Sequence, residues 1–257
     1  LLCRLALKHT AIDAASFTSI RLASGALVLW LIVRLRGGVH GIRGSWPSAL
    51  ALFAYAALFS YAYLGLATGM GALLLFGAVQ STMIGYGLWS GERLTRQQLA
   101  GLVCAFGGLA GLMLPGLSAP PPFASALMLG AGVAWGIYSL RGRGAGDPIG
   151  VTAGNFVRAA PMAALTSVVA LPWSSLDLDG FWYAVCSGAL ASGVGYAIWY
   201  RALRGLKATS AATVQLSVPV IAALGGIVFL GEAVSLRLLV ASAAILGGIG
   251  LVLAARR

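Results

Sequence analysis

The sequence predicts an all-α polytopic membrane protein with ten transmembrane helices, the first of them largely missing. Of the 257 residues, 60% are hydrophobic and only 9% are charged, and the mean hydropathy is +0.93. A soluble domain carries about 25% charged residues, and a chain of this size cannot hide so much apolar surface in one core. Because a membrane helix needs about 20 apolar residues, the length allows about ten crossings and leaves no room for a soluble domain.

Apolar runs between Gly, Pro and charged residues place the helices in order. The opening LLCRLALK is too short to span and is interpreted as the end of a first helix whose beginning is absent. Nine further spans are predicted at 16–33, 48–66, 70–89, 98–114, 123–140, 150–171, 180–200, 208–230 and 237–254. The connections are short and carry turn residues, as in PGLSAPPP and RGRGAGDP.

Basic residues orient the chain, because Lys and Arg in short loops favour the cytoplasmic side. The loops alternate, so that most of the 17 basic residues fall on one side and only Lys8 and Arg237 on the other. Arg4, Arg21 and Arg158 lie near or within spans, and the last two are close enough to a span start to snorkel to the interface. The pattern predicts a multi-pass protein of the cytoplasmic (inner) membrane with both termini cytoplasmic.

Composition and missing motifs exclude several classes of function. The net charge of +11 does not indicate nucleic-acid binding, because no basic stripe with interleaved aromatic residues stands outside the apolar runs. Cys3, Cys104 and Cys186 lack metal-ligand spacing, and neither a P-loop nor an HExxH motif is present. We expect no enzyme activity, no metal, no cofactor and no nucleic-acid partner. The expected partners are a small-molecule substrate and the lipid bilayer, with the chain a monomer or a weak homo-oligomer.

An internal repeat relates the two halves of the chain. A shift of 140 positions aligns 60–111 with its counterpart in the second half without a gap. Chance matching of glycine is an alternative in a chain with 36 of them. However, the only two glutamates, Glu92 and Glu232, follow Gly91 and Gly231 at the same place in the repeat, which weakens that alternative.

Five spans per repeat, an odd number, give the second copy the opposite orientation in the membrane. The repeats are predicted at 1–116 and 122–257. Charge agrees, because the loop near Ala67 has no basic residue whereas its counterpart near Lys207 is basic. Inverted repeats are typical of secondary transporters, so the sequence favours transport by alternating access over a purely structural role.

The two copies of the Gly-Glu segment carry a family resemblance. GERLTRQQLAGLVCAFGGLAGLML and GEAVSLRLLVASAAILGGIGLVL resemble the span-four-to-five segment of EamA-type proteins in the drug/metabolite transporter superfamily. VAWGIYSLRGRG resembles the opening of that family's second repeat, and the arginines in SIRLA and FVRAA resemble those of its second and seventh spans. The resemblance implies a ten-helix fold with both ends cytoplasmic, and a cavity-lining helix that carries Trp135 and Tyr138.

Polar and aromatic residues inside the spans are the candidates for a substrate site. The predicted substrate-binding residues are Tyr55, Phe59, Tyr63, Gln80, Trp135, Tyr138, Asn155, Tyr196, Trp199 and Gln215. Gln80 and Gln215 lie well inside spans that the repeat pairs, where a buried amide needs a partner or a water-lined cavity. Interhelical hydrogen bonding is the alternative for them, and core or interfacial packing is the alternative for the aromatic residues. Asn155, one turn before Arg158, is expected to pair with it or to touch solute.

Helix ends and glycines form a second set of predictions. The predicted hinge or helix-end residues are Gly91, Glu92, Pro219, Gly231 and Glu232. Gly ends a helix in a left-handed turn and Glu complements the dipole of the next helix, with a functional gate as the alternative. Pro219 removes a backbone donor and loosens its helix. Close helix approach is predicted at Gly101, Gly107, Gly108, Gly111, Gly247, Gly248 and Gly250.

The absence of charge from the spans narrows the mechanism. No Asp or Glu lies at a predicted bilayer centre, so the usual proton-relay groups are missing. We expect an exporter that moves small neutral or zwitterionic metabolites by facilitated diffusion or exchange, with apolar or aromatic amino acids fitting best. Its cavity should have aromatic walls, two Gln amides and little fixed charge. The alternatives are a non-transporting membrane scaffold and, less favoured, a membrane-embedded lipid-modifying enzyme.

Overall fold

The computed structural model describes residues 1–36, 42–89, 95–113, 119–142, 147–196, 198, 217–231 and 233–255. In these ranges the chain forms helices and no strand, which confirms the predicted all-α class. The helices are α1 (Leu2–His9), α2 (Ala14–Leu35), α3 (Trp46–Ala62), α4 (Thr68–Trp89), α5 (Arg96–Met113), α6 (Pro122–Arg141), α7 (Pro148–Val169), the 3-10 turn η1 (Leu171–Trp173), α8 (Leu178–Cys186), the π-helix η2 (Ser187–Val194), α11 (Ser217–Leu230) and α12 (Leu236–Ala254).

Several of these helices are long and apolar enough to cross a membrane by length and composition. They are α2, α6 and the Thr68–Gly87 part of α4. Shorter apolar helices are α3 and the Leu236–Leu251 part of α12. The chain is therefore an all-α polytopic membrane protein, as the sequence predicts.

Local capping explains where the helices begin. Asp13 precedes α2, and its carboxylate accepts hydrogen bonds from the first-turn amides of Ala15 and Ser16, both at 2.9 Å. Ser45 caps α3 in the same way through the amide of Ser48. The α3 span is shorter than predicted, ending at Ala62, because the turn that follows it is itself apolar and composition does not mark it.

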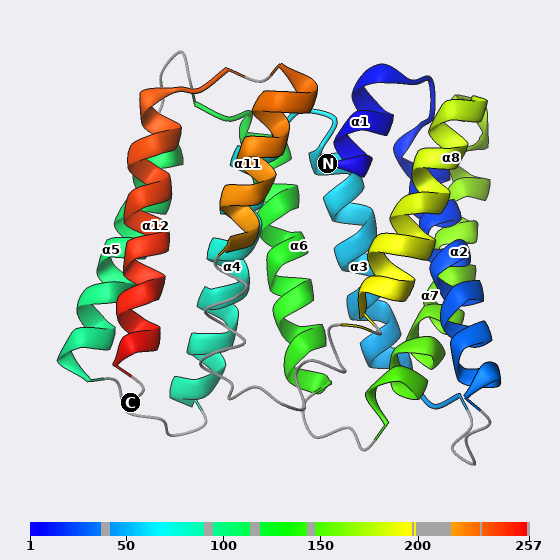
Figure 1. Ribbon diagram of the computed structural model, residues 1–257, viewed down its shortest axis with the longest axis horizontal. Helices are drawn as coiled ribbons and strands as arrows, with labels where there is room; N and C mark the ends of the chain where they lie inside the picture. Colours follow the sequence, from blue (N-terminus) through cyan, green and yellow to red (C-terminus); the bar gives the residue numbers. More distant parts are fainter. Residues whose placement is uncertain are drawn as a thin grey trace.

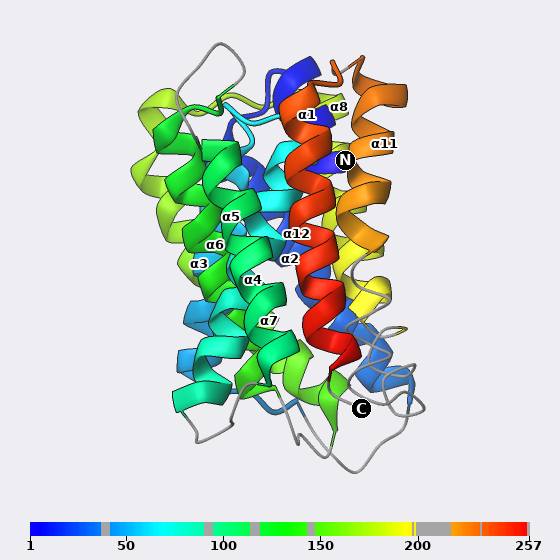
Figure 2. The same cartoon turned by 90° about the vertical axis from the view of Figure 1, so that its left-hand side faces the viewer.

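The helices stand side by side along one common direction (Figures 1 and 2), and the two halves of the chain contribute to every major contact. α5 packs on α12, α2 on α7, and α4 on α11. Two further sets of contacts are matched: α3 packs on α6 as α1 does on α8, and α3 packs on α7 as α2 does on α8 and η2. The packing of α4 on α6 has no matching contact of α11 on α1 of similar extent among the described residues. In each of the first three pairs the two helices run in opposite directions (Figure 1).

The α5–α12 crossing depends on two glycines that occupy the same position in the repeat. A Cβ on Gly108 would lie 2.7 Å from the Cβ of Ala244, and a Cβ on Gly248 would lie 2.3 Å from a backbone carbonyl oxygen of α5. Only glycine permits this approach, because a side chain would force the helices apart. The prediction is wrong for several neighbours, since none of the described residues lies within 4 Å of the Cβ positions of Gly107, Gly111, Gly247 and Gly250.

Hydrogen bonds join the two halves near both ends of α7. At one end the Asp13 carboxylate accepts from the Ser175 amide at 3.1 Å, and the Asp13 amide donates to the Ser175 carbonyl at 3.0 Å. At the other end the Ser45 amide donates to the side-chain oxygen of Asn155 at 3.0 Å. These are called the Asp13–Ser175 link and the Ser45–Asn155 link below.

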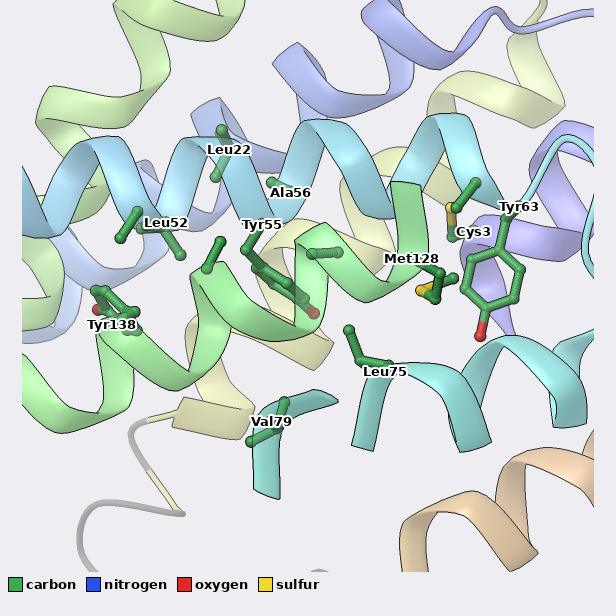
Figure 3. Packing of buried hydrophobic residues seen from close by; sticks show 14 of the residues in the cluster. Cys3, Leu22, Leu52, Tyr55, Ala56, Tyr63, Leu75, Val79, Met128 and Tyr138 are labelled. Carbon is green, nitrogen blue, oxygen red and sulfur yellow. The ribbon is translucent and has the colours of Figure 1, made fainter. Parts of the chain in front are cut away.

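The hydrophobic core lies where α3 and α6 meet α2 and α4 (Figure 3). Leu22 of α2, Leu52 of α3 and Met128 of α6 are each at most 1% exposed. In Figure 3 the Tyr55 side chain lies between α3 and α6, and Leu75 and Val79 approach it from α4. The core is therefore built by both halves of the chain together.

The basic helix ends separate in the way that the loop pattern predicts. The end of α2, the start of α5 and the end of α6 lie at one end of the bundle (lower in Figure 1), and they carry Arg34, Arg96 and Arg141. The end of α1 and the start of α12 lie at the opposite end, with Lys8 and Arg237. Which end faces the cytoplasm stays a prediction.

Candidate functional site

Aromatic side chains from three helices meet around Trp135 of α6. Its ring centroid lies 4.7 Å from that of Tyr55 on α3, 5.5 Å from Tyr138 on α6 and 5.4 Å from Tyr196, which follows η2. Phe59 joins through Tyr55, with 5.5 Å between their centroids. Residues three or four positions apart share one face of a helix, which is why the sequence spacing grouped Tyr55 with Phe59 and Trp135 with Tyr138. We call these five residues the aromatic cluster.

The cluster extends to one residue that the sequence analysis missed. Phe156 of α7 makes an edge contact with Tyr196, with 5.8 Å between the ring centroids, and it is 1% exposed. It reaches this place because Gly25 of α2 leaves room for it: a Cβ there would lie 2.7 Å from the Phe156 ring. The signal available in the sequence was only an apolar residue in a span, which does not distinguish this position from ordinary core.

Tyr63 lies at the edge of this group and takes part in the α3–α4 corner. Its ring meets Phe59 edge-on at 4.7 Å. Its hydroxyl donates to the Thr68 carbonyl at 3.3 Å, and its own carbonyl accepts from Arg4 at 2.6 Å. These contacts tie the end of α3 to the start of α4 and to α1.

Arg21 of α2 is buried against the aromatic cluster, with 7% of its surface exposed. The centre of its guanidinium lies 5.4 Å from the Tyr55 ring centroid and 5.2 Å from that of Phe59, within reach of a cation–π interaction. Nη2 donates to the Tyr55 hydroxyl at 3.3 Å, and Nε donates to the Ser192 hydroxyl at 3.5 Å. Nη1 is buried and has no hydrogen-bond partner within the described part of the chain.

Two predictions are therefore wrong at Arg21. The side chain does not snorkel to an interface, and the aromatic cluster is not free of fixed charge. The physical reason is the close packing of α2 on η2 at Gly188, where a Cβ would lie 2.1 Å from the Arg21 carbonyl oxygen and 2.0 Å from the Ser24 hydroxyl. This approach covers the backbone of α2 at Arg21, and the long side chain lies against Tyr55 and Phe59 instead of reaching an interface.

The π-helix η2 brings Ser192 to Arg21. The Ser192 hydroxyl donates to the Ser187 carbonyl, five residues earlier, at 3.0 Å. A π turn breaks the regular i→i−4 pattern and is frequent at functional sites. Nothing in the SGALASGV segment predicted it, because its composition suits an α-helix equally well.

The other predicted site residues have separate surroundings or lie outside the described residues. Asn155 is 2% exposed and holds the start of α3 through the Ser45–Asn155 link. It does not pair with Arg158, whose Nη1 donates to the Gly154 carbonyl at 2.9 Å. Gln80 is half-buried in α4. The predicted residues outside the described ranges are Gly91, Glu92, Trp199, Gln215 and Glu232.

Two predicted hinge positions lie at the ends of α11. Gly231 follows Leu230, the last residue of the helix, with φ of 61°, a left-handed conformation that suits glycine. Pro219 is the third residue of α11, and the residues in which its predicted kink would lie precede Ser217, outside the described part. In the residues searched, no group of three or more His, Cys, Asp or Glu side chains could hold a metal ion.

Comparisons with known proteins agree on one family. A model of the EamA-like transporter family matches residues 122–254. The chain is similar to the uncharacterized protein PA1977 of Pseudomonas aeruginosa, with 57% identity over 257 residues, 100% of this chain and 90% of that protein. It is also similar to the threonine/homoserine exporter RhtA of Escherichia coli K12, with 36% identity over 140 residues.

The reach of these similarities differs. The RhtA match covers 51% of this chain and 46% of RhtA, so the chain matches less than half of that protein's length. A protein of known crystal structure has the same fold over 100% of this chain and 95% of its own, with a TM-score of 0.70 and 21% identity. The family match and the resemblance of the repeated segments coincide. The chain belongs to the EamA-like transporter family.

Proposed function

We propose that this chain exports small neutral or zwitterionic metabolites, such as amino acids, across the cytoplasmic membrane by alternating access. Family membership makes it a membrane transporter. The observation that carries the proposal is the aromatic cluster, because Tyr55 comes from the N-terminal half whereas Trp135 and Tyr196 come from the C-terminal half. A site shared by two halves changes access when the halves move against each other.

The packing of the helices supports alternating access. Several contacts between the halves have a counterpart in the repeat, and the helices of the α5–α12, α2–α7 and α4–α11 pairs run in opposite directions (Figure 1). Two similar bundles of opposed orientation can exchange roles and open a site between them to either side in turn. The sequence repeat, with its matched Gly-Glu pairs, supports the same arrangement.

Two features support small zwitterionic substrates. RhtA is named as a threonine/homoserine exporter, and half of this chain is similar to it. Aromatic rings with the hydroxyls of Tyr55 and Ser192 offer stacking and hydrogen bonding to a small solute. Facilitated diffusion or exchange is the proposed mode, because no Asp or Glu lies inside a predicted span.

Efflux from liposomes tests the proposal. The purified full chain is reconstituted, and release of radiolabelled L-threonine or L-phenylalanine is compared with protein-free liposomes. Trp135→Ala removes the residue that holds the cluster together, so we expect at least a tenfold loss of flux. The matched control is Trp173→Ala, because Trp173 is 78% exposed and should not affect flux.

Two further outcomes decide against parts of the proposal. Accumulation of solute driven by an imposed proton gradient would contradict facilitated diffusion or exchange. Replacing Gln80 and Gln215 by Leu tests their predicted contact with solute, and unchanged flux removes them from the site. A chain that inserts normally but moves no solute contradicts transport and favours a scaffold.

A further inference from the structure

We infer that Arg21 binds a carboxylate group of the transported solute. The inference rests on the proposed transport function and narrows its substrates to small monocarboxylates, zwitterionic amino acids among them, at the expense of neutral solutes. It starts from the position of a charged side chain that is enclosed between α2, α3 and η2.

The guanidinium of Arg21 makes fewer and longer hydrogen bonds among the described residues than its N–H groups allow. A guanidinium carries five N–H donors, and a bond from it to a carboxylate is about 2.7–2.9 Å long. The two contacts that Arg21 makes, to the hydroxyls of Tyr55 and Ser192, go to neutral oxygens at 3.3 and 3.5 Å. Nη1 has no hydrogen-bond partner among the residues that the structure describes. Buried donors are almost always satisfied, so an orphaned one calls for an acceptor.

Among the residues that the structure describes, no carboxylate is bonded to Arg21. The acidic residues all lie outside the predicted spans: Asp13, Glu92, Asp147, Asp177, Asp179 and Glu232. The nearest of them in sequence, Asp13, already accepts hydrogen bonds from two amides in the first turn of α2 and from the amide of Ser175. A buried charge without a partner is costly, and an anionic group on the solute would supply the partner.

The surroundings of Arg21 favour a carboxylate on a small organic molecule. The rings of Tyr55 and Phe59 flank the guanidinium and fix its plane. A planar guanidinium matches a carboxylate with two parallel hydrogen bonds. One buried cation balances one negative charge, which suits a carboxylate better than a phosphate dianion. Trp135, beside Tyr55, offers an aromatic surface for the rest of the solute.

Arg158 provides a matched control. It occupies the corresponding place in the second half, since SIRLA and FVRAA align at a shift of 137. Arg158 is only half-buried, and its Nη1 is satisfied by the Gly154 carbonyl of its own helix. The same substitution at the two positions therefore removes the same side chain from two different environments.

The experiment compares acids with their amides. The full chain is reconstituted in liposomes, and unlabelled L-phenylalanine, L-phenylalaninamide, L-threonine and L-threoninamide compete for exchange of the labelled acid. We expect each acid to compete at least tenfold better than its amide, the loss that a hydrogen bond to a charged group implies. Arg21→Met should abolish this preference, Arg21→Lys should retain part of it, and Arg158→Met should leave it intact.

Several results overturn the inference. If acid and amide compete equally well for the unsubstituted chain, the inference is wrong. This result needs no variant, so the test can be decided even if Arg21→Met fails to fold. A folded Arg21→Met chain that still prefers the acids to their amides also contradicts the inference. If inorganic phosphate competes as well as the acids, Arg21 binds phosphate and the inferred carboxylate ligand is wrong. If the chain transports amides or other neutral solutes equally well, transport stands and only this inference fails; if it moves no solute, the proposed function fails with it.

Discussion

Arg21 and Arg158 occupy corresponding places in the two halves, and their surroundings differ completely. Arg21 is enclosed beside Tyr55 and Phe59, whereas Arg158 is half-buried and bonded to the backbone of its own helix. Gly108 and Gly248, by contrast, correspond in the repeat and still do the same work at the α5–α12 crossing. Packing positions have kept their equivalence and positions near the aromatic cluster have lost it. The helices of the two halves are thus arranged alike, whereas the buried arginine beside the aromatic cluster comes from the first half.

The largest effect is expected at Gly188, where η2 packs closely on α2 next to Arg21. Gly188→Ala places a methyl group 2.1 Å from the Arg21 carbonyl oxygen, and α2 and η2 must separate to admit it. Overpacking of this kind costs about 3 kcal/mol. We expect a marked fall in Tm together with loss of flux. Gly85→Ala is the control, because in the part of the chain that the structure describes no atom lies within 4 Å of a Cβ at that position. A Gly188→Ala chain that melts like the unsubstituted protein would show that this approach does not enclose Arg21.

The second-largest effect distinguishes the two arginines by how their replacement changes transport and thermal stability. Arg21→Met removes a buried charge without a balancing anion, and such a replacement is often neutral or stabilising. We expect transport of acids to fall at least tenfold while Tm stays level or rises. Arg158→Met should leave transport unchanged. Differential scanning fluorimetry of both variants, beside the flux assay, checks this. A steep drop in Tm for Arg21→Met would mark Arg21 as a structural charge.

The smallest effect concerns the starts of α2 and α7. Partial burial of Asp13 disfavours its charged form, but hydrogen bonds from Ser16, Ser175 and Ala15 outweigh this, so its pKa lies below the ordinary value of 3.8. Its stabilising contribution is therefore complete above pH 3.8 and is lost as the pH falls through the lower folded-state pKa. Asp147, which precedes α7, makes no such side-chain cap.

Thermal unfolding at several pH values measures that difference. Asp13→Asn should lower stability at pH 7 by about 0.5 kcal/mol, the range of a charge at an exposed helix end. The gap to the unsubstituted protein should close as the pH falls toward 3. Asp147→Asn should show a smaller gap at pH 7, because the Asp147 side chain accepts no capping hydrogen bond. An equal gap for both variants would remove the distinction between the two helix starts.

The sequence predicted the helices well and the site only in part. Apolar runs are long and end at Pro, Gly or charge, so the α2, α6 and α12 bounds were found within two residues. Helical spacing also grouped Tyr55 with Phe59, and Trp135 with Tyr138. Burial of Arg21 could not be predicted, because depth along a helix says nothing about which face meets protein. For the same reason the sequence did not distinguish Gly108, which lies in the contact with α12, from Gly107, which has no described residue within 4 Å of its Cβ position.

The links near the two ends of α7 have a consequence for movement of the two halves. The Asp13–Ser175 link holds the start of α2 to the segment after α7, and the Ser45–Asn155 link holds the start of α3 to α7. Both links cross from one half of the chain to the other. A movement that opens the site to the opposite side must therefore break or bend them.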